Sequence, residues 1–370
     1  MLNLGLVINP WAGIGGAVAL KGSDGAEVRA EALRRGAEPK ANARVRAALE
    51  LLQPYAGQLH FFTAGGQMGE ALLKSLEFRH TVVYQSETDE TQAADTQAAV
   101  SALMQHRLGL ILFAGGDGTA RDVYIVCGEE QPVLGIPAGV KIHSAVYAVS
   151  PKAAGEILIE LCTGKALELA SAAVKDLDED QYRAGNVKAR MFGYMKVPAS
   201  PLMQQSKESA RAAEPQQVQD IVEYLQESLE DDTLYLIGSG STCMALKTEL
   251  GIDASLLGVD AWHNGQQLLK DATAEQLLTL ATEHSSVKLI ITVIGGQGHV
   301  FGRGNQQLSP ALLRHIGRDH IIVIASPGKL QSLQGRPLLL DTGDAELDQE
   351  LAGPIRVITG YESEALYALS

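Results

Sequence analysis

Glycine residues cluster at three points where an apolar run gives way to a helical stretch, namely residues 115–119, 238–242 and 295–307. Glycine permits a positive φ and lets the backbone approach a ligand closely. The N–H groups at the start of the next helix then point at a bound phosphate. The three turns therefore predict phosphate-binding loops, although a tight turn that merely needs glycine has the same composition.

The first turn carries the residues with the clearest chemistry. Gly115, Gly116 and Gly118 leave space for a triphosphate, whose oxygens the backbone amides can meet. Asp117 could orient Mg²⁺ or take the proton from an attacking hydroxyl, and Thr119 could bond a phosphate or cap the following helix. We predict Asp117 as the catalytic residue, and we expect Asp117→Asn to abolish phosphoryl transfer with little change in melting temperature.

Residues 301–307 of the third turn offer one cation, amide side chains and flexible backbone, a mixture that suits a sugar–phosphate or a nucleobase better than an acyl chain. The second turn, residues 238–242, contains only glycine, serine and threonine. We predict that both turns bind the phosphoryl acceptor, and that alanine at Arg303 and Asn305 weakens acceptor binding while ATP binding persists. The residues predicted to contact the acceptor are Gly238, Ser239, Thr242, Gly295, Gly296, Arg303 and Asn305.

Lys141, Arg121 and Arg303 are the cations nearest to the glycine turns, and each could neutralise phosphate charge or form a surface salt bridge. The histidines nearest to loops, His143, His263 and His299, show no metal-ligand spacing and are interpreted as ordinary polar positions. The acidic run at residues 176–180 is interpreted as a solvated turn.

The elements that must position these turns alternate between strand and helix. Expected strands cover residues 4–8, 60–63, 81–84, 108–113 and 133–136, and expected helices cover residues 41–52, 67–76 and 91–106. Strands that are apolar on both faces and separated by helices indicate a parallel sheet covered on both sides. Residues 1–150 are therefore predicted to form a doubly wound α/β nucleotide-binding domain.

A second, largely α/β domain is predicted over residues 166–335, with the cleft between the two domains. It begins with antiparallel strands within residues 166–197, followed by a polar, proline-bounded linker at residues 198–217. A second parallel sheet is then expected, and strands near residues 338–340 and 355–358 within the tail 336–370 could join either domain. The expected helices are 218–229, 242–250, 274–284 and 310–316, and the expected strands are 234–237, 256–261, 287–294 and 321–325.

Composition excludes several classes of protein. The 370 residues are 46% hydrophobic and 20% charged, with a net charge of −14, so the chain is globular and acidic. This charge argues against nucleic-acid and anionic-membrane partners. Three scattered cysteines signal neither a zinc cluster nor a disulfide framework. With no signal-peptide pattern and no long apolar run, we expect a cytoplasmic protein.

The order of three short motifs resembles the NAD kinase / diacylglycerol kinase superfamily. The segment GGDGT at residues 115–119 looks like its signature, and Asn9, Pro10 and Gly13 are similar to its NPxxG element. Pro137 and Gly139 stand where relatives have a Pro-x-Gly phosphate or ribose loop. Residues 15–25, 135–141 and 295–307 resemble the ATP-NAD kinase-like branch, which includes the acetoin-catabolism X proteins, over nearly the whole chain.

The resemblance implies that Asn9, Gly13, Pro137, Gly139 and Lys141 bind nucleotide or phosphate. It also implies a kinase that uses ATP, or polyphosphate, with Mg²⁺, and NAD as the first candidate acceptor. The chain departs from the lipid kinases at residues 140–143, and it shows no Asn-Glu pair like the one with which NAD kinases grip their dinucleotide. A lipid kinase and a non-catalytic nucleotide-binding regulator stay open as alternatives, as does assembly into a homo-oligomer.

Overall fold

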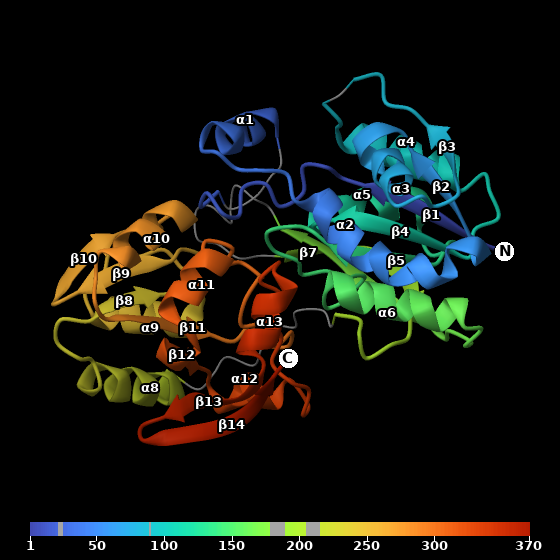
Figure 1. The fold of residues 1–370 in the computed structure, drawn as a ribbon. Helices are drawn as coiled ribbons and strands as arrows, with labels where there is room; N and C mark the ends of the chain where they lie inside the picture. Colours follow the sequence, from blue (N-terminus) through green and yellow to red (C-terminus); the bar gives the residue numbers. More distant parts are fainter. Residues whose placement is uncertain (21–24, 89, 178–188, 205–214) are drawn as a thin grey trace. The chain divides into compact units, whose positions relative to one another are not determined.

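The computed structural model describes residues 1–20, 25–88, 90–177, 189–204 and 215–370 (Figure 1). The chain divides into two compact units. The N-terminal unit comprises Met1–Ile14, Gly22–Arg34 and Glu38–Ser206. The C-terminal unit comprises Gly15–Lys21, Arg35–Ala37 and Lys207–Ser370.

The N-terminal unit is built on a five-stranded sheet in the order β3-β2-β1-β4-β5, in which every pairing is parallel. β1 and β4 are buried along most of their length because helices cover both faces of the sheet. This confirms the predicted doubly wound α/β architecture. The strands are β1 (Leu2–Ile8), β2 (Leu59–Ala64), β3 (His80–Tyr84), β4 (Leu110–Gly115) and β5 (Val133–Pro137).

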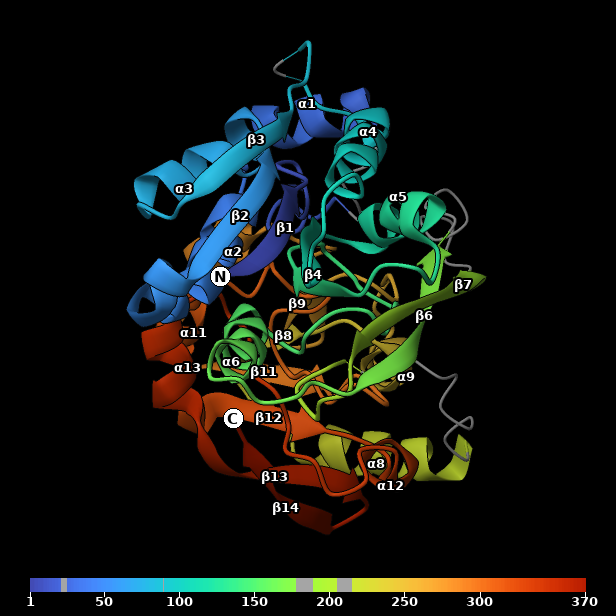
Figure 2. The same ribbon diagram turned by 90° about the vertical axis from the view of Figure 1, so that its right-hand side faces the viewer.

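Helices α2 and α6 pack together beside this sheet, as do α4 and α5 (Figure 2). The helix expected over residues 41–52 ends at Leu49 and continues as a 3₁₀ helix that contains Pro54, whose nitrogen has no hydrogen to donate. The helices are α1 (Ala26–Arg34), α2 (Ala41–Leu49), α3 (Glu70–Ser75), α4 (Ala93–Leu103), α5 (Asp117–Cys127) and α6 (Pro151–Cys162), with 3₁₀ helices η1 (Glu50–Gln58) and η2 (Gly66–Met68).

An antiparallel pair of strands, β6 (Leu169–Leu177) and β7 (Ala189–Pro198), completes the N-terminal unit. Figure 2 shows the two strands side by side. Val174, Met195 and Val197 belong to the same apolar core as β1 and β4, so the pair packs within this unit. The sequence assigns these strands to the second domain, whereas the N-terminal unit extends to Ser206. Residues 178–180 and much of the expected linker lie outside the described residues.

The C-terminal unit contains a mixed seven-stranded sheet in the order β10-β9-β8-β11-β12-β13-β14. The four middle strands β8, β11, β12 and β13 are parallel, as expected. The sheet is nevertheless mixed and not the parallel sheet that the sequence predicts, because β9 pairs antiparallel with both β8 and β10, and β14 pairs antiparallel with β13. The strands are β8 (Leu234–Ile237), β9 (Asp260–His263), β10 (Gln266–Leu269), β11 (Val287–Thr292), β12 (Ile321–Ile324), β13 (Gly353–Gly360) and β14 (Ser363–Leu369).

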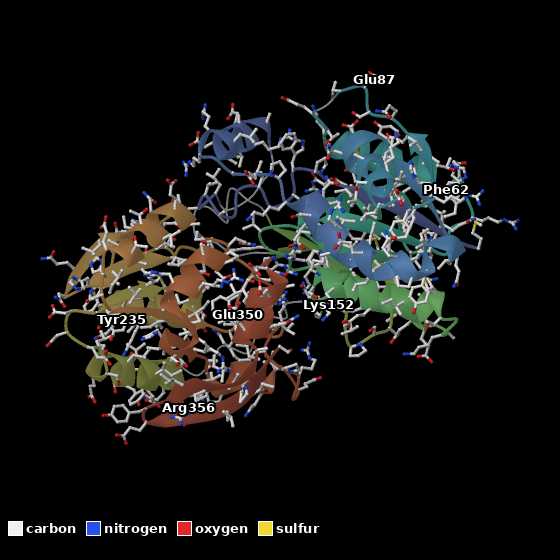
Figure 3. All side chains as sticks on the ribbon, viewed as in Figure 1. Phe62, Glu87, Lys152, Tyr235, Glu350 and Arg356 are labelled. Carbon is white, nitrogen blue, oxygen red and sulfur yellow. The ribbon has the colours of Figure 1, made fainter. Side chains whose placement is uncertain are left out.

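Helices α8 and α9 pack together against this sheet, and α10 packs with α11 (Figure 1). Tyr235 of β8, labelled in Figure 3, belongs to the apolar core that α8 and α9 share with the sheet. The helices are α8 (Pro215–Glu227), α9 (Ser241–Glu249), α10 (Ala274–Thr282), α11 (Pro310–Ile316), α12 (Pro327–Gln331) and α13 (Ala345–Leu351), with 3₁₀ helix η3 (Arg318–His320). In the described part of the chain, no helix is long and apolar enough to cross a membrane.

The C-terminal unit also includes a segment near the N-terminus and the tail of the chain. Ala17, within the expected N-terminal domain, accepts a hydrogen bond of 3.0 Å from the backbone of Ala274, and both belong to the C-terminal unit. In the tail, residues 338–340 form only isolated bridges, whereas the expected strand at residues 355–358 lies within β13 of the C-terminal sheet.

Candidate functional site

The three motifs of the N-terminal unit meet where β1 and β4 lie side by side. The connections from these strands leave in opposite directions across the sheet, and ligands bind at such switch points in open α/β sheets. Asn9 follows β1 and donates from its backbone to Ala114 of β4 at 3.0 Å. Its side chain donates to Thr119 Oγ1 at 3.1 Å and accepts from the backbone of Trp11 at 3.1 Å. Asn9 therefore joins the first motif to the GGDGT turn.

Glycine is required where these turns touch. Gly13 has φ +77°, and a Cβ there would lie 2.1 Å from the carbonyl oxygen of Ala138. A Cβ on Gly139 would lie 2.6 Å from the Cα of Gly116. The backbone of Gly139 also donates to Gly115 at 2.9 Å. The loop after β5 is thus held against the GGDGT turn, and no side chain fits between them.

The N-terminus of α5 opens directly from the turn. Gly116 is its N-cap residue, and no side chain caps the helix there. Thr119 is the third residue of α5 and not its cap; its hydroxyl accepts from Asn9 and would lie 2.2 Å from a Cβ on Gly115. The first N–H groups of a helix have no partner within the helix, so those near Gly118 suit an anion. Tyr147, which the sequence did not single out, donates to the Gly116 carbonyl at 2.6 Å.

Asp117 is buried, and its carboxylate is held by the loop after β5. Oδ2 accepts from the His143 backbone at 2.7 Å and from His143 Nδ1 at 3.0 Å, and Oδ1 accepts from the Ser144 backbone at 2.9 Å. Three N–H donors thus occupy most of the acceptor positions that a carboxylate has. Asp117 is therefore a residue that positions the loop and the imidazole, a role that the sequence did not predict.

The His143 ring is oriented by this contact. Because a carboxylate only accepts, Nδ1 carries a hydrogen, and in the neutral ring Nε2 is then left as an acceptor. Within the described residues, Nε2 has no hydrogen-bond partner. An oriented imidazole with an available Nε2 is the arrangement that serves as a general base. The sequence placed His143 near a loop but gave no reason to prefer it.

Arg121 and Lys141, two of the predicted phosphate-neutralising cations, have different surroundings. Arg121 donates to Asp176 of β6 at 2.6 Å and so links α5 to the β6–β7 pair instead of pointing to the turn. Lys141 lies on the loop that carries His143, and its carbonyl oxygen would be 3.9 Å from a Cβ on Gly116. The loop that carries Lys141 therefore packs against the GGDGT turn.

In the C-terminal unit, the turn after β8 lies tightly against the end of β11. Gly240 has φ +110°, and a Cβ there would lie 2.6 Å from Thr292 at the end of β11. Ser239 donates to the Gly304 carbonyl at 3.1 Å, and Thr242 accepts from Lys329 Nζ at 2.8 Å. Hydrogen bonds thus connect the turn that begins at Gly238 to the third glycine turn, through Gly304, and to α12, through Lys329.

The third turn is largely occupied by its own contacts. Gly296, which follows Gly295, uses its N–H for Ser332 at 3.0 Å and its carbonyl for Arg336 at 3.0 Å. Asn305 accepts from Gly302 at 2.9 Å and donates to Val300 at 2.8 Å.

Arg303 is 3% exposed and forms an ion pair of 2.8 Å with Asp341. The structure therefore gives Arg303 and Asn305 roles within the loop, and acceptor binding by this turn stays a prediction.

Among the described residues, no three His, Cys, Asp or Glu side chains gather closely enough to hold a metal ion. Mg²⁺ takes octahedral oxygen ligands and is usually held by one or two carboxylates together with substrate phosphates. With both oxygens already accepting, Asp117 fits such a site poorly. His263 meets the ring of His284 at 5.0 Å between centroids, and His299 is 1% exposed, so the interpretation of these two as ordinary polar positions stays a prediction.

Two family models match the chain. The model of the ATP-NAD kinase N-terminal domain matches residues 4–166, and that of the ATP-NAD kinase C-terminal domain matches residues 230–369. No curated protein and no solved structure matches significantly. The first match contains every residue of the site around Asp117, and the second contains the turns after β8 and β11.

Proposed function

Since this chain belongs to the ATP-NAD kinase family, we propose that it is a small-molecule kinase that transfers the γ-phosphoryl group of ATP to the 2′-hydroxyl of NAD. The observation that carries the proposal is the Asp117–His143 pair beside the GGDGT turn. It places an oriented base next to a glycine turn and a helix N-terminus suited to phosphate, at the switch point of a doubly wound sheet.

The turn and the helix hold the phosphates in this proposal. The N–H groups at the start of α5 meet phosphate oxygens, while Gly115, Gly116 and Gly139 keep side chains out of the approach. Phosphoryl transfer depends mainly on positioning and charge neutralisation, so few side chains are needed. Mg²⁺ would come with ATP and be held chiefly by the phosphates, since Asp117 offers little room for it.

His143 acts on the acceptor. Its Nε2 takes the proton of the attacking hydroxyl, the hydroxyl oxygen forms a bond to the γ-phosphorus, and the bond from that phosphorus to the β–γ bridging oxygen breaks, which releases ADP. The Asp117 carboxylate stabilises the imidazolium through Nδ1. A well-placed general base contributes about 10²–10⁴-fold to such a step.

A product assay tests the proposal directly. The purified chain is incubated with Mg²⁺, ATP or polyphosphate as donor, and NAD as acceptor, and NADP is detected by mass spectrometry. Formation of NADP that depends on donor and enzyme supports the proposal, and the donor arms decide between ATP and polyphosphate. Binding of ATP or NAD without any product would favour the non-catalytic regulator, and phosphorylation of diacylglycerol or a sphingoid base would favour the lipid kinase.

A further inference from the structure

The C-terminal unit has a switch point of its own. β8 and β11 are adjacent parallel strands, and the chain continues from β8 toward β9 on one side of the sheet and from β11 toward β12 on the other. Ligands bind at the carboxyl ends of strands where connections diverge in this way. The residues found at these ends are Ser239 and Gly240 after β8, Thr292 at the end of β11, and Ser326 after β12.

The turn after β8 leads into a helix long enough to hold an anion. α9 spans nine residues and begins at Ser241, directly after Gly240, whose φ of +110° turns the chain tightly against β11. The N–H of Gly240 donates to the carbonyl of Leu256, and the N–H of Met244 donates to the carbonyl of Gly240. The N–H groups of residues 241–243, which lie between Gly240 and Met244, have no carbonyl partner within the helix.

A cation lies beside this helix N-terminus. Lys329 of α12 donates from Nζ to Thr242 Oγ1 at 2.8 Å and to Thr292 Oγ1 at 2.9 Å. Thr242 is the second residue of α9 and Thr292 the last of β11, so one ammonium group joins the helix start to the strand end. Both hydroxyls accept from Lys329, which orients them around a positive charge.

A buried hydroxyl on the same face completes the arrangement. Ile290 and Ile324 belong to the core that β11 and β12 share with α8 and α9, whereas Val293 and Ala325 belong to the core on the other face. The alternation thus persists past the end of β12, where the backbone is still extended, and the residues two positions after the isoleucines continue along the first face. Those residues are Thr292 and Ser326. Ser326 is fully buried, does not cap α12 although it is its N-cap residue, and has no hydrogen-bond partner for Oγ within the described residues. A buried hydroxyl without a partner is costly unless a ligand supplies one.

We propose that the α9 N-terminus, Lys329 and Ser326 form a binding site for the phosphate group of a small ligand, such as a nucleotide. Lys329 supplies charge, the α9 amides and the Ser326 hydroxyl supply donors, and the glycine turn allows close approach. The site goes beyond the proposed phosphoryl transfer, because it lies wholly within the C-terminal unit and needs no chemistry at Asp117.

Titration of the full chain with inorganic phosphate by calorimetry tests the site. Lys329→Met should remove one phosphate-binding event. Ser326→Ala should weaken that event roughly tenfold without lowering stability in urea, because the hydroxyl it removes bonds nothing in the free protein. The matched control is Lys288→Met, which removes the same charge from β11 but from a lysine paired with Glu230 at 2.5 Å. Its phosphate binding should equal that of the unmodified chain.

The outcomes separate this proposal from the kinase proposal, since phosphate binding requires no turnover. If Ser326→Ala destabilises the free protein, or if Lys329→Met binds phosphate as well as Lys288→Met does, the cluster is a structural clasp and the site is refuted. Absence of phosphate binding by the unmodified chain refutes it too. If the unmodified chain forms NADP and Lys329→Met still binds as much phosphate as the unmodified chain, the kinase proposal is supported and the second phosphate site is refuted.

Discussion

Asp117→Asn is the substitution whose effect can be worked out most fully from the structure. In the less costly orientation, the amide oxygen takes the place of Oδ2 and keeps both hydrogen bonds with His143. The amide nitrogen then faces the N–H of Ser144, a fully buried residue, so one charge-assisted bond is lost and a buried donor has no acceptor. The sequence alone predicts little change in melting temperature, but these contacts replace that expectation with a loss of about 2–3 kcal/mol in the free energy of unfolding.

Turnover should fall much further than stability. The amide oxygen still fixes the hydrogen on His143 Nδ1, but the negative charge that stabilises the imidazolium is gone. We expect kcat for the phosphorylated product to fall by about 10²–10⁴-fold. The measurements are urea unfolding and product formation, with ATP binding followed in parallel to show that the donor site survives.

Asp122→Asn provides a matched control. Asp122 lies on the same helix, is also buried, and accepts from Gln97 at 3.2 Å, but it does not touch His143. This variant should keep its turnover whatever stability it loses. The reasoning is refuted if Asp117→Asn is as stable as the unmodified chain, or if its turnover matches that of Asp122→Asn.

Three further predictions test other parts of the structure. In urea unfolding, Gly13→Ala should lower the free energy of unfolding by at least about 2 kcal/mol more than Gly128→Ala does. Both positions have positive φ, but only at Gly13 does the new Cβ collide with a carbonyl oxygen. Equal losses would contradict the close contact. Arg303→Ala should lower the free energy of unfolding by about 3–5 kcal/mol because it breaks the buried ion pair with Asp341, whereas Arg356→Ala, from an exposed pair, should lower it little. Burial raises the pKa of Cys127 to about 12 and that of Cys243 to about 11, so both thiols are neutral at pH 8, and a disulfide reagent should modify the less buried Cys162 first and all three only in urea.

The strands of the N-terminal unit could be predicted because their apolar pattern is local. A run buried on both faces, such as Leu110–Gly115, has no polar position to confuse the assignment, and glycine marks where it ends. Helix ends were harder, as the 3₁₀ continuation at Glu50–Gln58 shows, because propensity there changes little from one residue to the next.

Pairings between distant segments could not be predicted in the same way. The antiparallel edge β9–β10 turns at Asn264 and Gly265, a typical hairpin signal, but the short flanking strands are too polar to stand out. The assignment of β6 and β7 to the N-terminal unit depends on side chains such as Met195 joining its core, which the sequence of the two strands does not reveal.

In the candidate sites, the sequence identified the turns but missed the residues that complete them. Gly116 was singled out for close approach, and Gly13 and Gly139 through the family resemblance; the contacts of all three show why a side chain is excluded. His143 lies 26 positions from Asp117, and Lys329 lies 87 positions from Thr242, so no spacing rule connects either pair. Only the fold brings them together.

The loop after β5 shows why a motif does not define its own chemistry. An aspartate at the start of a phosphate-facing helix would repel ATP unless its charge were offset. Here His143 and Ser144 supply the three offsetting donors, at the end of the stretch 140–143 where the chain departs from the lipid kinases and at the residue directly after it. Asp117 and residues 140–144 therefore form one hydrogen-bonded unit. A relative with another loop would need other donors to hold the same carboxylate. The base that we propose follows from this partnership and not from the aspartate alone.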